Sequence, residues 1–348
     1  MKYPLISIAI ATFNSEKTLK KTLDSIKKQT YPAGRIETLI IDGGSSDKTL
    51  AIAKKYQTKI IPNKQTELIY AKYIGFYQAK GKYLIYLDSD EVLETSKSLE
   101  IKYAAINQNQ KIKAVLLSGY KTPPDSPQIN NYINEFGDPF SFFVYRESKG
   151  DHFLIQDFSR KYKKNLIANN RYSVVIDFNR VQPLPLIELW AGGCMIDLEY
   201  TRKVFPQIKK NPGLIAHLFY LLNAKEKYLA ISKGDNTIHY SVPSFEKYLK
   251  KLSSRIKNNV FSTDMGKGGF KGRERYQDSL YQFRRFVFLP YALTLLFPFI
   301  DGVILVITRR KIIYLVHPVL CFYTAFLIVF YYALKLVGLR IEKQSYGN

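Results

Sequence analysis

The first ninety residues alternate between short apolar runs and amphipathic stretches, and this alternation constrains the fold more than any other feature of the sequence. Apolar, β-prone runs occupy residues 5–11, 36–41, 59–61 and 83–87. Between them, apolar side chains recur at helical spacing within 16–29, 49–56 and 67–79. Strands that alternate with helices predict an α/β fold with a doubly wound, mostly parallel sheet that helices flank.

Polar side chains follow three of the predicted strands: Asn14, Asp42 and Asp88. The carboxyl ends of parallel strands meet at one edge of the sheet, and ligands bind outside that edge. Asp88 and Asp90 are separated by one serine, so an extended chain aims both carboxylates the same way. Two close carboxylates repel each other unless a cation lies between them, and hard oxygen ligands suit Mg²⁺ or Mn²⁺. We therefore expect a divalent cation there, with a solvated acidic corner as the plain alternative.

Three blocks in this half resemble family 2 glycosyltransferases of the GT-A fold. They are Ser-Ile-Ala-Ile-Ala-Thr-Phe-Asn-Ser at 7–15, Ile-Ile-Asp-Gly-Gly-Ser-Ser-Asp-Lys-Thr at 40–49 and Ala-Lys-Gly-Lys-Tyr-Leu-Ile-Tyr-Leu-Asp-Ser-Asp at 79–90. Their order and spacing are similar to the family over residues 1–95. The resemblance implies a Rossmann-like GT-A domain, a nucleotide-diphospho-sugar donor and inverting transfer.

The resemblance also implies which residues contact the donor: Thr12, Phe13, Asn14, Asp42, Gly43, Lys72 and Asp88. Asp42 would accept a hydrogen bond from the base, although Asp-Gly-Gly-Ser is also an ordinary turn sequence. Lys72 stands where the family often has an arginine and would contact the diphosphate. The next residue, Tyr73, replaces the usual asparagine. A cation at Asp88 and Asp90, together with a lysine, would stabilise the charge on the departing diphosphate.

For residues 96–240 the resemblance assigns an acceptor half. Trp190, Gly192 and Gly193 resemble the small-residue segment beneath the acceptor site, while a core indole is the alternative for Trp190. His239 lies near the end of a predicted strand over 231–240 and resembles a family histidine that approaches the metal or the diphosphate. A structural histidine is the alternative there.

The expected Glu-Asp motif, whose aspartate acts as general base, is missing. The corresponding residues are Ala216 and His217. His217 could replace the aspartate, because its unperturbed pKa of about 6.5 suits a base. A buried core histidine is the other interpretation. If His217 is not the base, another residue acts, the acceptor is a phosphate that needs none, or transfer activity is lost.

The net charge of +23, from 52 basic and 29 acidic residues, predicts anionic partners. Residues 241–285 hold eleven Lys or Arg and four Asp or Glu, a local net charge of +7. Apolar side chains recur at helical spacing from Phe245 to Ile256, with basic residues between them. This pattern predicts a basic amphipathic helix on anionic membrane lipids. We expect no nucleic-acid partner, because hydrophobic segments follow this charge directly.

Residues 286–308 and 312–334 are each long enough to cross ~30 Å of hydrocarbon. The second segment has no charged residue. The first contains Pro290, Pro298 and Asp301, so it could be kinked or re-entrant. The Arg-Arg-Lys linker at 309–311 conflicts with a simple hairpin below a cytoplasmic domain, because basic loops favour the cytoplasm. The sequence therefore predicts one or two transmembrane helices and leaves the topology open.

Together these patterns predict three regions: a GT-A domain at 1–240 (donor half 1–95, acceptor half 96–240), a basic juxtamembrane region at 241–285 and membrane segments at 286–348. Residues 1–4 lead directly into a strand, so we expect no secretory leader, and two distant cysteines fit a reducing compartment. The predicted protein is a membrane-associated inverting glycosyltransferase on the cytoplasmic face, acting on a lipid-linked or cell-surface glycan. Alternatives are an inactive nucleotide-sugar-binding membrane protein and a sugar-phosphate nucleotidyltransferase.

Overall fold

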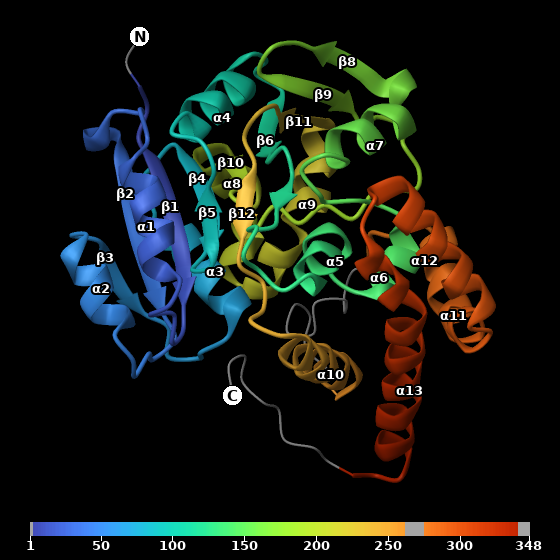
Figure 1. Ribbon diagram of the computed structural model, residues 1–348. Helices are drawn as coiled ribbons and strands as arrows, with labels where there is room; N and C mark the ends of the chain where they lie inside the picture. Colours follow the sequence, from blue (N-terminus) through green and yellow to red (C-terminus); the bar gives the residue numbers. More distant parts are fainter. Residues whose placement is uncertain (1–2, 262–274, 340–348) are drawn as a thin grey trace.

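The computed structural model describes residues 3–261 and 275–339 and confirms the α/β fold class (Figure 1). A nine-stranded sheet forms its centre, with helices on both faces. Its strands, in spatial order, are β3 (Lys59–Pro62), β2 (Ile36–Asp42), β1 (Ile6–Thr12), β4 (Tyr83–Asp88), β10 (Met195–Asp197), β6 (Ile112–Leu116), β11 (Tyr228–Ser232), β9 (Ser173–Asp177) and β8 (Leu166–Asn169). All of them run in one direction except β10 and β9, so the sheet is mixed and mostly parallel.

The predicted strands and helices of the donor half are confirmed, with ends that differ by at most three residues. The helices are α1 (Leu19–Lys27), α2 (Thr49–Lys55) and α3 (Leu68–Gln78). Successive residues of β1 serve opposite faces: Ile8 packs on the side of α1 and α2, and Ala9 on the side of α3. In register, Thr12 pairs with Asp42 and Ala11 with Asp88, so the strand ends are level. The sequence pattern is therefore sufficient to align this edge.

The acceptor half adds helices whose sequence patterns were less readable. They are α4 (Ser98–Asn107), α5 (Ile129–Phe136), α6 (Pro139–Tyr145), α7 (Leu154–Lys161), α8 (Leu198–Val204) and α9 (Leu218–Glu226). Helix α4 packs on the same face of the sheet as α1. Helices α8 and α9 pack on the opposite face, together with α3. The boundary between the donor and acceptor halves stays a prediction.

The predicted single strand over 231–240 is wrong. The chain forms β11 in the large sheet, turns at Gly234 (φ +69°), and forms β12 (Thr237–His239) in a second, three-stranded sheet. That sheet has the order β5 (Glu91–Leu93), β12 and β7 (Tyr120–Lys121). An ion pair between Lys102 of α4 and Asp235, both fully buried, holds the turn. The turn brings His239 beside Glu91 of β5.

The C-terminal part consists of α10 (Phe245–Phe261), α11 (Ser279–Leu293), α12 (Leu296–Arg309) and α13 (His317–Leu336), with a 3₁₀ turn at Ile312–Val316 before α13. The predicted amphipathic helix after residue 241 is confirmed as α10, with Tyr248, Leu252 and Ile256 buried. Residues 262–274 of the predicted basic region and 340–348 of the predicted membrane region lie outside the described residues.

The first predicted hydrophobic segment is two helices, α11 and α12, which meet at an angle of 94°. The break falls at Leu295 (φ +55°), between Pro290 in α11 and Pro298 in α12. Within the described residues, one stretch is long and apolar enough to cross a membrane, Ile312–Leu336. The bent pair counts as a second only if it forms one broken span.

Candidate functional site

The Asp-Ser-Asp sequence lies at the carboxyl end of β4, at the centre of the aligned edge. Helix α3 packs closely against β1 at Gly75. A Cβ at that position would lie only 2.7 Å from the Cβ of Ala9, so a larger residue would not fit there without a shift. This close packing brings Lys72, which is 1% exposed, to the end of β4. Its Nζ donates to Asp88 Oδ1 and, at 3.2 Å, to the carbonyl oxygen of Leu87. Lys72 and Asp88 thus form an ion pair at the site, while their contact with a diphosphate stays a prediction.

Asp90 and His239 form a second pair, although 149 residues of sequence separate them. His239 Nε2 lies 3.7 Å from Asp90 Oδ2, and the Tyr240 amide donates to the Asp90 carbonyl oxygen at 3.0 Å. On the other side of the ring, His239 Nδ1 lies 3.1 Å from Ser241 Oγ. This contact orients the imidazole so that Nε2 faces the carboxylate.

The charges of this pair support each other. Burial by itself raises the pKa of Asp90, but the hydrogen bond and charge of His239, together with the charge of Lys251, lower it below its ordinary value. Burial by itself lowers the pKa of His239, but Asp90 and Glu91 raise it above its ordinary value. Each partner therefore favours the charged form of the other: the pKa of Asp90 is lowered and that of His239 is raised.

Glu91 is a site residue that the sequence analysis missed. It is 1% exposed, and its carboxylate accepts hydrogen bonds from the Asp88 amide at 2.8 Å, the Tyr120 hydroxyl at 3.0 Å and the Gly192 amide at 3.1 Å. Burial, and then the negative charge of Asp88, raises its pKa to about 7. Glu91 therefore joins the donor motif to the Gly-Gly segment. Its position directly after Asp-Ser-Asp was the available signal, but sequence spacing does not show that β5 turns inward.

The predicted metal ligands were Asp88, Asp90 and His239. Among the described residues, no three His, Cys, Asp or Glu side chains converge on one point. Asp88 is held by Lys72, which leaves Asp90 and His239 as one oxygen and one nitrogen donor. Mg²⁺ and similar cations commonly take one or two protein ligands and complete their shell with water and substrate phosphates. The donor set fits a cation shared with a diphosphate, and metal dependence stays a proposal.

The predicted donor-binding residues of the first two loops lie together beside this cluster. Asp42 is 5% exposed and its carboxylate accepts hydrogen bonds from Thr12 Oγ1, from Ser45 Oγ and from the amides of Gly44 and Ser45, at 2.6–3.0 Å. The turn interpretation of Asp42 is thus correct. Recognition of a base by the same carboxylate remains untested.

Asn14 locks the two loops together, and its backbone has a left-handed conformation (φ +46°). Its Oδ1 accepts from the Ser46 amide at 2.9 Å, and its own amide donates to Ser45 Oγ at 2.9 Å. A Cβ on Gly43 would lie 3.4 Å from the Phe13 ring, so the glycine keeps the loops close. Roles for these residues in nucleotide binding stay predictions.

The predicted acceptor segment runs beside Glu91. Gly192 and Gly193 have φ values of +70° and +75°, and the Gly192 carbonyl oxygen accepts from Thr237 Oγ1 at 2.9 Å. Trp190 is half-buried, and its indole Nε1 is buried with no hydrogen-bond partner among the described residues. Contact of this segment with an acceptor stays a prediction.

His217 ends a 3₁₀ helix (Pro212–His217) and is 1% exposed. Its ring centroid lies 5.2 Å from that of Tyr276, which stacks on Tyr220. A histidine this deeply buried can reach an acceptor hydroxyl only if the surrounding chain moves. Its role as a base stays a prediction.

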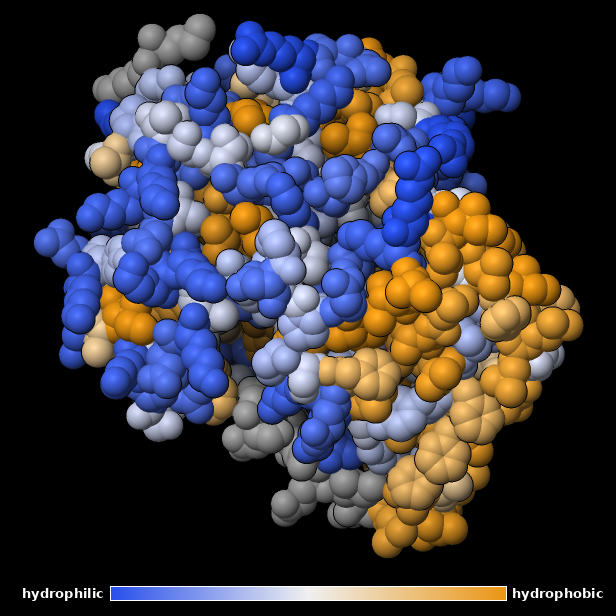
Figure 2. Space-filling view, viewed as in Figure 1, coloured by the Kyte–Doolittle hydropathy of each residue, from blue (hydrophilic) through white to orange (hydrophobic). Residues whose placement is uncertain are grey.

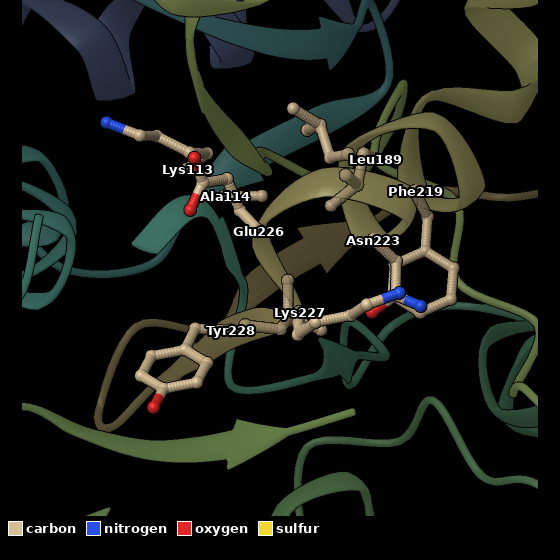
Figure 3. Close-up of a pocket in the computed structure, with 10 residues that line it drawn as sticks. Lys113, Ala114, Leu189, Phe219, Asn223, Glu226, Lys227 and Tyr228 are labelled. Atoms are coloured by element: carbon tan, nitrogen blue, oxygen red, sulfur yellow. The ribbon is translucent and has the colours of Figure 1, made fainter. Parts of the chain in front are cut away.

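Figure 3 shows a small cavity elsewhere in the molecule. Lys113 and Ala114 line it from the start of β6, and Lys227 and Tyr228 from the start of β11. Those strand starts lie at the edge opposite the carboxyl end of β4. Its volume of about 10 Å³ suffices for one water molecule and not for a nucleotide.

Comparison with known proteins supports the family resemblance. Residues 7–168, a little under half of the chain, match the model of glycosyl transferase family 2. This segment is similar to that family. The match contains the Asn14, Asp42 and Asp88–Asp90 loops but not Gly192, His217 or His239.

Curated relatives match about a quarter of this chain. Glycosyltransferase AglE of Haloferax volcanii is 32% identical over 93 residues, which cover 25% of this chain and 31% of AglE. A dolichyl N-acetyl-alpha-D-glucosaminyl phosphate 3-beta-D-2,3-diacetamido-2,3-dideoxy-beta-D-glucuronosyltransferase of Methanococcus voltae is 40% identical over 87 residues, covering 23% and 27%. The chain therefore matches less than a third of either relative.

Solved structures agree on the fold. The mannosyltransferase PcManGT of Pyrobaculum calidifontis, solved with GDP-Man and Mn²⁺, superimposes with a TM-score of 0.52 at 11% identity. The superposition covers 94% of this chain and 88% of PcManGT. This similarity extends the GT-A-like fold to nearly the whole chain.

Proposed function

We propose that this protein is a membrane-associated, metal-dependent inverting glycosyltransferase with its catalytic domain on the cytoplasmic face. It moves a sugar from a nucleotide-diphospho-sugar to a lipid-linked or cell-surface glycan acceptor. The observation that carries the proposal is the pairing of Asp90 with His239, 3.7 Å apart, beside the Lys72–Asp88 ion pair at the end of β4. The ammonium group of Lys72 and the two candidate metal ligands, Asp90 and His239, lie at one strand end. This arrangement suits the binding of a diphosphate.

The residues of this cluster act on the leaving group. Asp90 and His239 would hold a bound Mg²⁺ or Mn²⁺, which would supply Lewis-acid stabilisation of the diphosphate. Lys72 forms an ion pair with Asp88. Its buried ammonium group lies next to the departing phosphates and stabilises their charge. Glu91 keeps Gly192 next to the Asp-Ser-Asp motif, so donor and acceptor surfaces stay in register.

A phosphate-bearing lipid suits the acceptor side. The oxygen of a polyprenyl phosphate is already ionised and needs no general base, which agrees with the missing carboxylate at Ala216 and His217. Helix α10 begins six residues after His239, and the charge of its Lys251 lowers the pKa of Asp90. The Methanococcus voltae relative is named for a dolichyl-linked sugar phosphate, which supports a lipid-linked acceptor.

The second candidate is an inactive nucleotide-sugar-binding membrane protein. The buried His217, at the position where the family has its base, is the observation in its favour. The third alternative, a sugar-phosphate nucleotidyltransferase, gains no support from the family match.

The test uses the full chain in detergent with UDP-, GDP- and dTDP-sugars and Mn²⁺, with and without polyprenyl phosphate. Transfer to the lipid supports the proposal, and the Asp90→Ala variant is the inactive control. Donor binding with neither hydrolysis nor transfer, to lipid or glycan, supports the second candidate. Absence of donor binding overturns both.

A further inference from the structure

Helices α11, α12 and α13 present one continuous apolar surface to the outside. Figure 2 shows it as the broad hydrophobic area at the lower right, beside a mostly hydrophilic surface with smaller hydrophobic spots. Its most prominent members, which define what we call the docking face, are Phe286 (81% exposed), Leu296, Ile304, Ile307 (70%), Phe322 and Phe326. On α13 the exposed apolar residues Val319, Phe322, Phe326 and Val329 recur every three or four positions, so they form a stripe along one side. Monomeric soluble domains rarely expose an apolar area of this kind.

The opposite side of α13 is attached to the catalytic domain at its beginning. Tyr314, just before the helix, donates to the buried carboxylate of Glu135 in α5. His317 Nδ1 lies 2.6 Å from the Tyr132 hydroxyl, also in α5. Arg309, at the end of α12, pairs with the same Glu135 at 2.8 Å. The basic linker at 309–311 therefore stays against the catalytic domain.

The far end of α13 is attached as well. Lys335 Nζ donates to the Val260 carbonyl oxygen of α10 at 2.7 Å. One turn earlier, Tyr331 lies 2.7 Å from Ser253 of α10 through their hydroxyl oxygens. Helix α10 thus accompanies the C-terminal half of α13.

Helix α10 cannot follow α13 into hydrocarbon without severe cost. Its outer side carries Lys247, Lys250 and Glu246, which are exposed, and Lys251 and Arg255 are partly exposed. Charged side chains at membrane depth are strongly unfavourable. If α13 crossed the bilayer, the end of α10 that is bonded to it would have to enter the hydrocarbon too.

We propose that α11, α12 and α13 form a monotopic docking face that lies in the plane of an anionic bilayer, and that α13 does not cross it. This inference rests on the membrane association in the proposed function and replaces the transmembrane helices that the sequence predicted. The apolar stripe enters the boundary between headgroups and acyl chains to a depth of about 5–10 Å. Lysines of α10 lie beside the same helix and supply the charge that anionic headgroups attract. Both ends of α13 then remain on the side of the catalytic domain.

Labelling with a membrane-impermeant maleimide tests the topology in cells that express the full chain. Cys194 and Cys321 are buried, so maleimide labelling detects the new surface cysteines and not the native ones. Leu336→Cys, at the end of α13, is compared with Lys54→Cys on the exposed side of α2. We expect both sites to be labelled in the same preparation, either intact cells or inverted vesicles. Labelling of the two sites from opposite sides of the membrane would overturn the inference.

Flotation with vesicles tests the docking face. Ile304→Glu and Phe326→Glu change side chains that are 50% and 56% exposed, so the fold is retained. The matched control is Ile167→Glu, at an exposed isoleucine of β8 (45%). We expect each docking-face variant to bind phosphatidylglycerol vesicles at least about tenfold more weakly, with the control unchanged. Unchanged binding in both docking-face variants would overturn the assignment of the face.

The same variants separate this inference from the proposed function. Donor hydrolysis in detergent should be equal in Ile304→Glu, Phe326→Glu and the unmodified chain, because detergent replaces the bilayer. A chain with no donor binding would overturn the proposed function while the labelling still decides the topology. An active chain with α13 across the membrane would overturn only the inference.

Discussion

The α/β domain and the C-terminal helices place polar and apolar side chains in opposite ways. In the α/β domain the apolar residues of β1 and β4 are buried, and the functional carboxylates Asp88 and Asp90 lie at a partly exposed edge, each about a quarter exposed. In the helical region, many apolar residues face outward and some polar side chains lie inside. Asp301, Tyr291 and His317 form one such polar chain, which begins at the exposed Arg146, with contacts of 2.6–2.9 Å.

The difference shows that the two regions meet different surroundings and use polar clusters for different purposes. The edge cluster is open, so its charges can act on a ligand. The inner cluster joins α11, α12 and α13 to α5 and α6, so its charges act on the fold. Under the proposed membrane association, apolar packing between these helices competes with equally apolar lipid, so the polar contacts contribute more to holding them together.

The largest expected effect is the loss of activity in Asp90→Ala. It would show that the edge cluster acts on a ligand, whereas the inner cluster acts on the fold. Removing one of two protein ligands of the cation should lower donor turnover by at least about 100-fold, with the fold intact. The measurement is Mn²⁺-dependent donor binding and turnover. Asp125→Ala, in an exposed loop, is the control and should behave like the unmodified chain. Undiminished Mn²⁺-dependent affinity in Asp90→Ala would remove Asp90 from the site.

Glu135→Ala should affect stability rather than chemistry. Glu135 is 3% exposed and accepts from Arg309, Tyr314 and Ser148. Its loss leaves Arg309 with Asp157, 3.7 Å away, as its remaining carboxylate partner, so we expect the free energy of unfolding to fall by at most about 3–5 kcal/mol. Thermal unfolding in detergent measures the change, and Glu199→Ala, on the exposed side of α8, is the control. Equal stability of the two variants would contradict a stabilising role for the polar contacts of the helical region.

Gly192→Ala tests the joint between the donor and acceptor halves. The new Cβ would lie 2.5 Å from the Tyr120 hydroxyl, on a backbone with φ +70°. We expect a loss of about 1–3 kcal/mol in the free energy of unfolding. Gly44→Ala has positive φ in open space and reports strain alone, and Gly34→Ala has neither feature. A loss no larger than that of Gly44→Ala would show that Tyr120 moves aside freely.

The smallest effect concerns pH at the boundary of the two regions. Burial raises the pKa of Glu147 above its ordinary 4.5, although Lys161 at 2.6 Å opposes this rise. The folded chain therefore holds this proton more tightly than the unfolded chain. Its contribution to the free energy of unfolding falls as pH rises from 4.5 through the folded pKa, and then stays constant. Unfolding of Glu147→Gln across this range should lack that decline. A parallel decline in both proteins would assign it to another group.

The donor edge was predictable from the sequence, whereas its partners were not. Strands β2 and β4 both pair in parallel with β1, and local periodicity predicted where each strand ends, so Asn14, Asp42 and Asp88 were expected at one edge. His239 lies beside Asp90, although its strand was predicted wrongly, and its role as a metal ligand stays a prediction. Glu91 escaped notice because its partner Gly192 lies 101 residues away.

Composition and spacing by themselves determined the α/β class, the Asp-Ser-Asp edge and the apolar character of the C-terminal segments, because these depend on residues within one or two turns or strands of each other. Tertiary structure decided that Lys72 neutralises Asp88, that α11 and α12 bend by 94°, and that α13 is attached at both ends. The physical reason is common to all three. An ion pair, a bend or a covered helix face depends on which distant segment packs against it, and spacing along one chain does not contain that information.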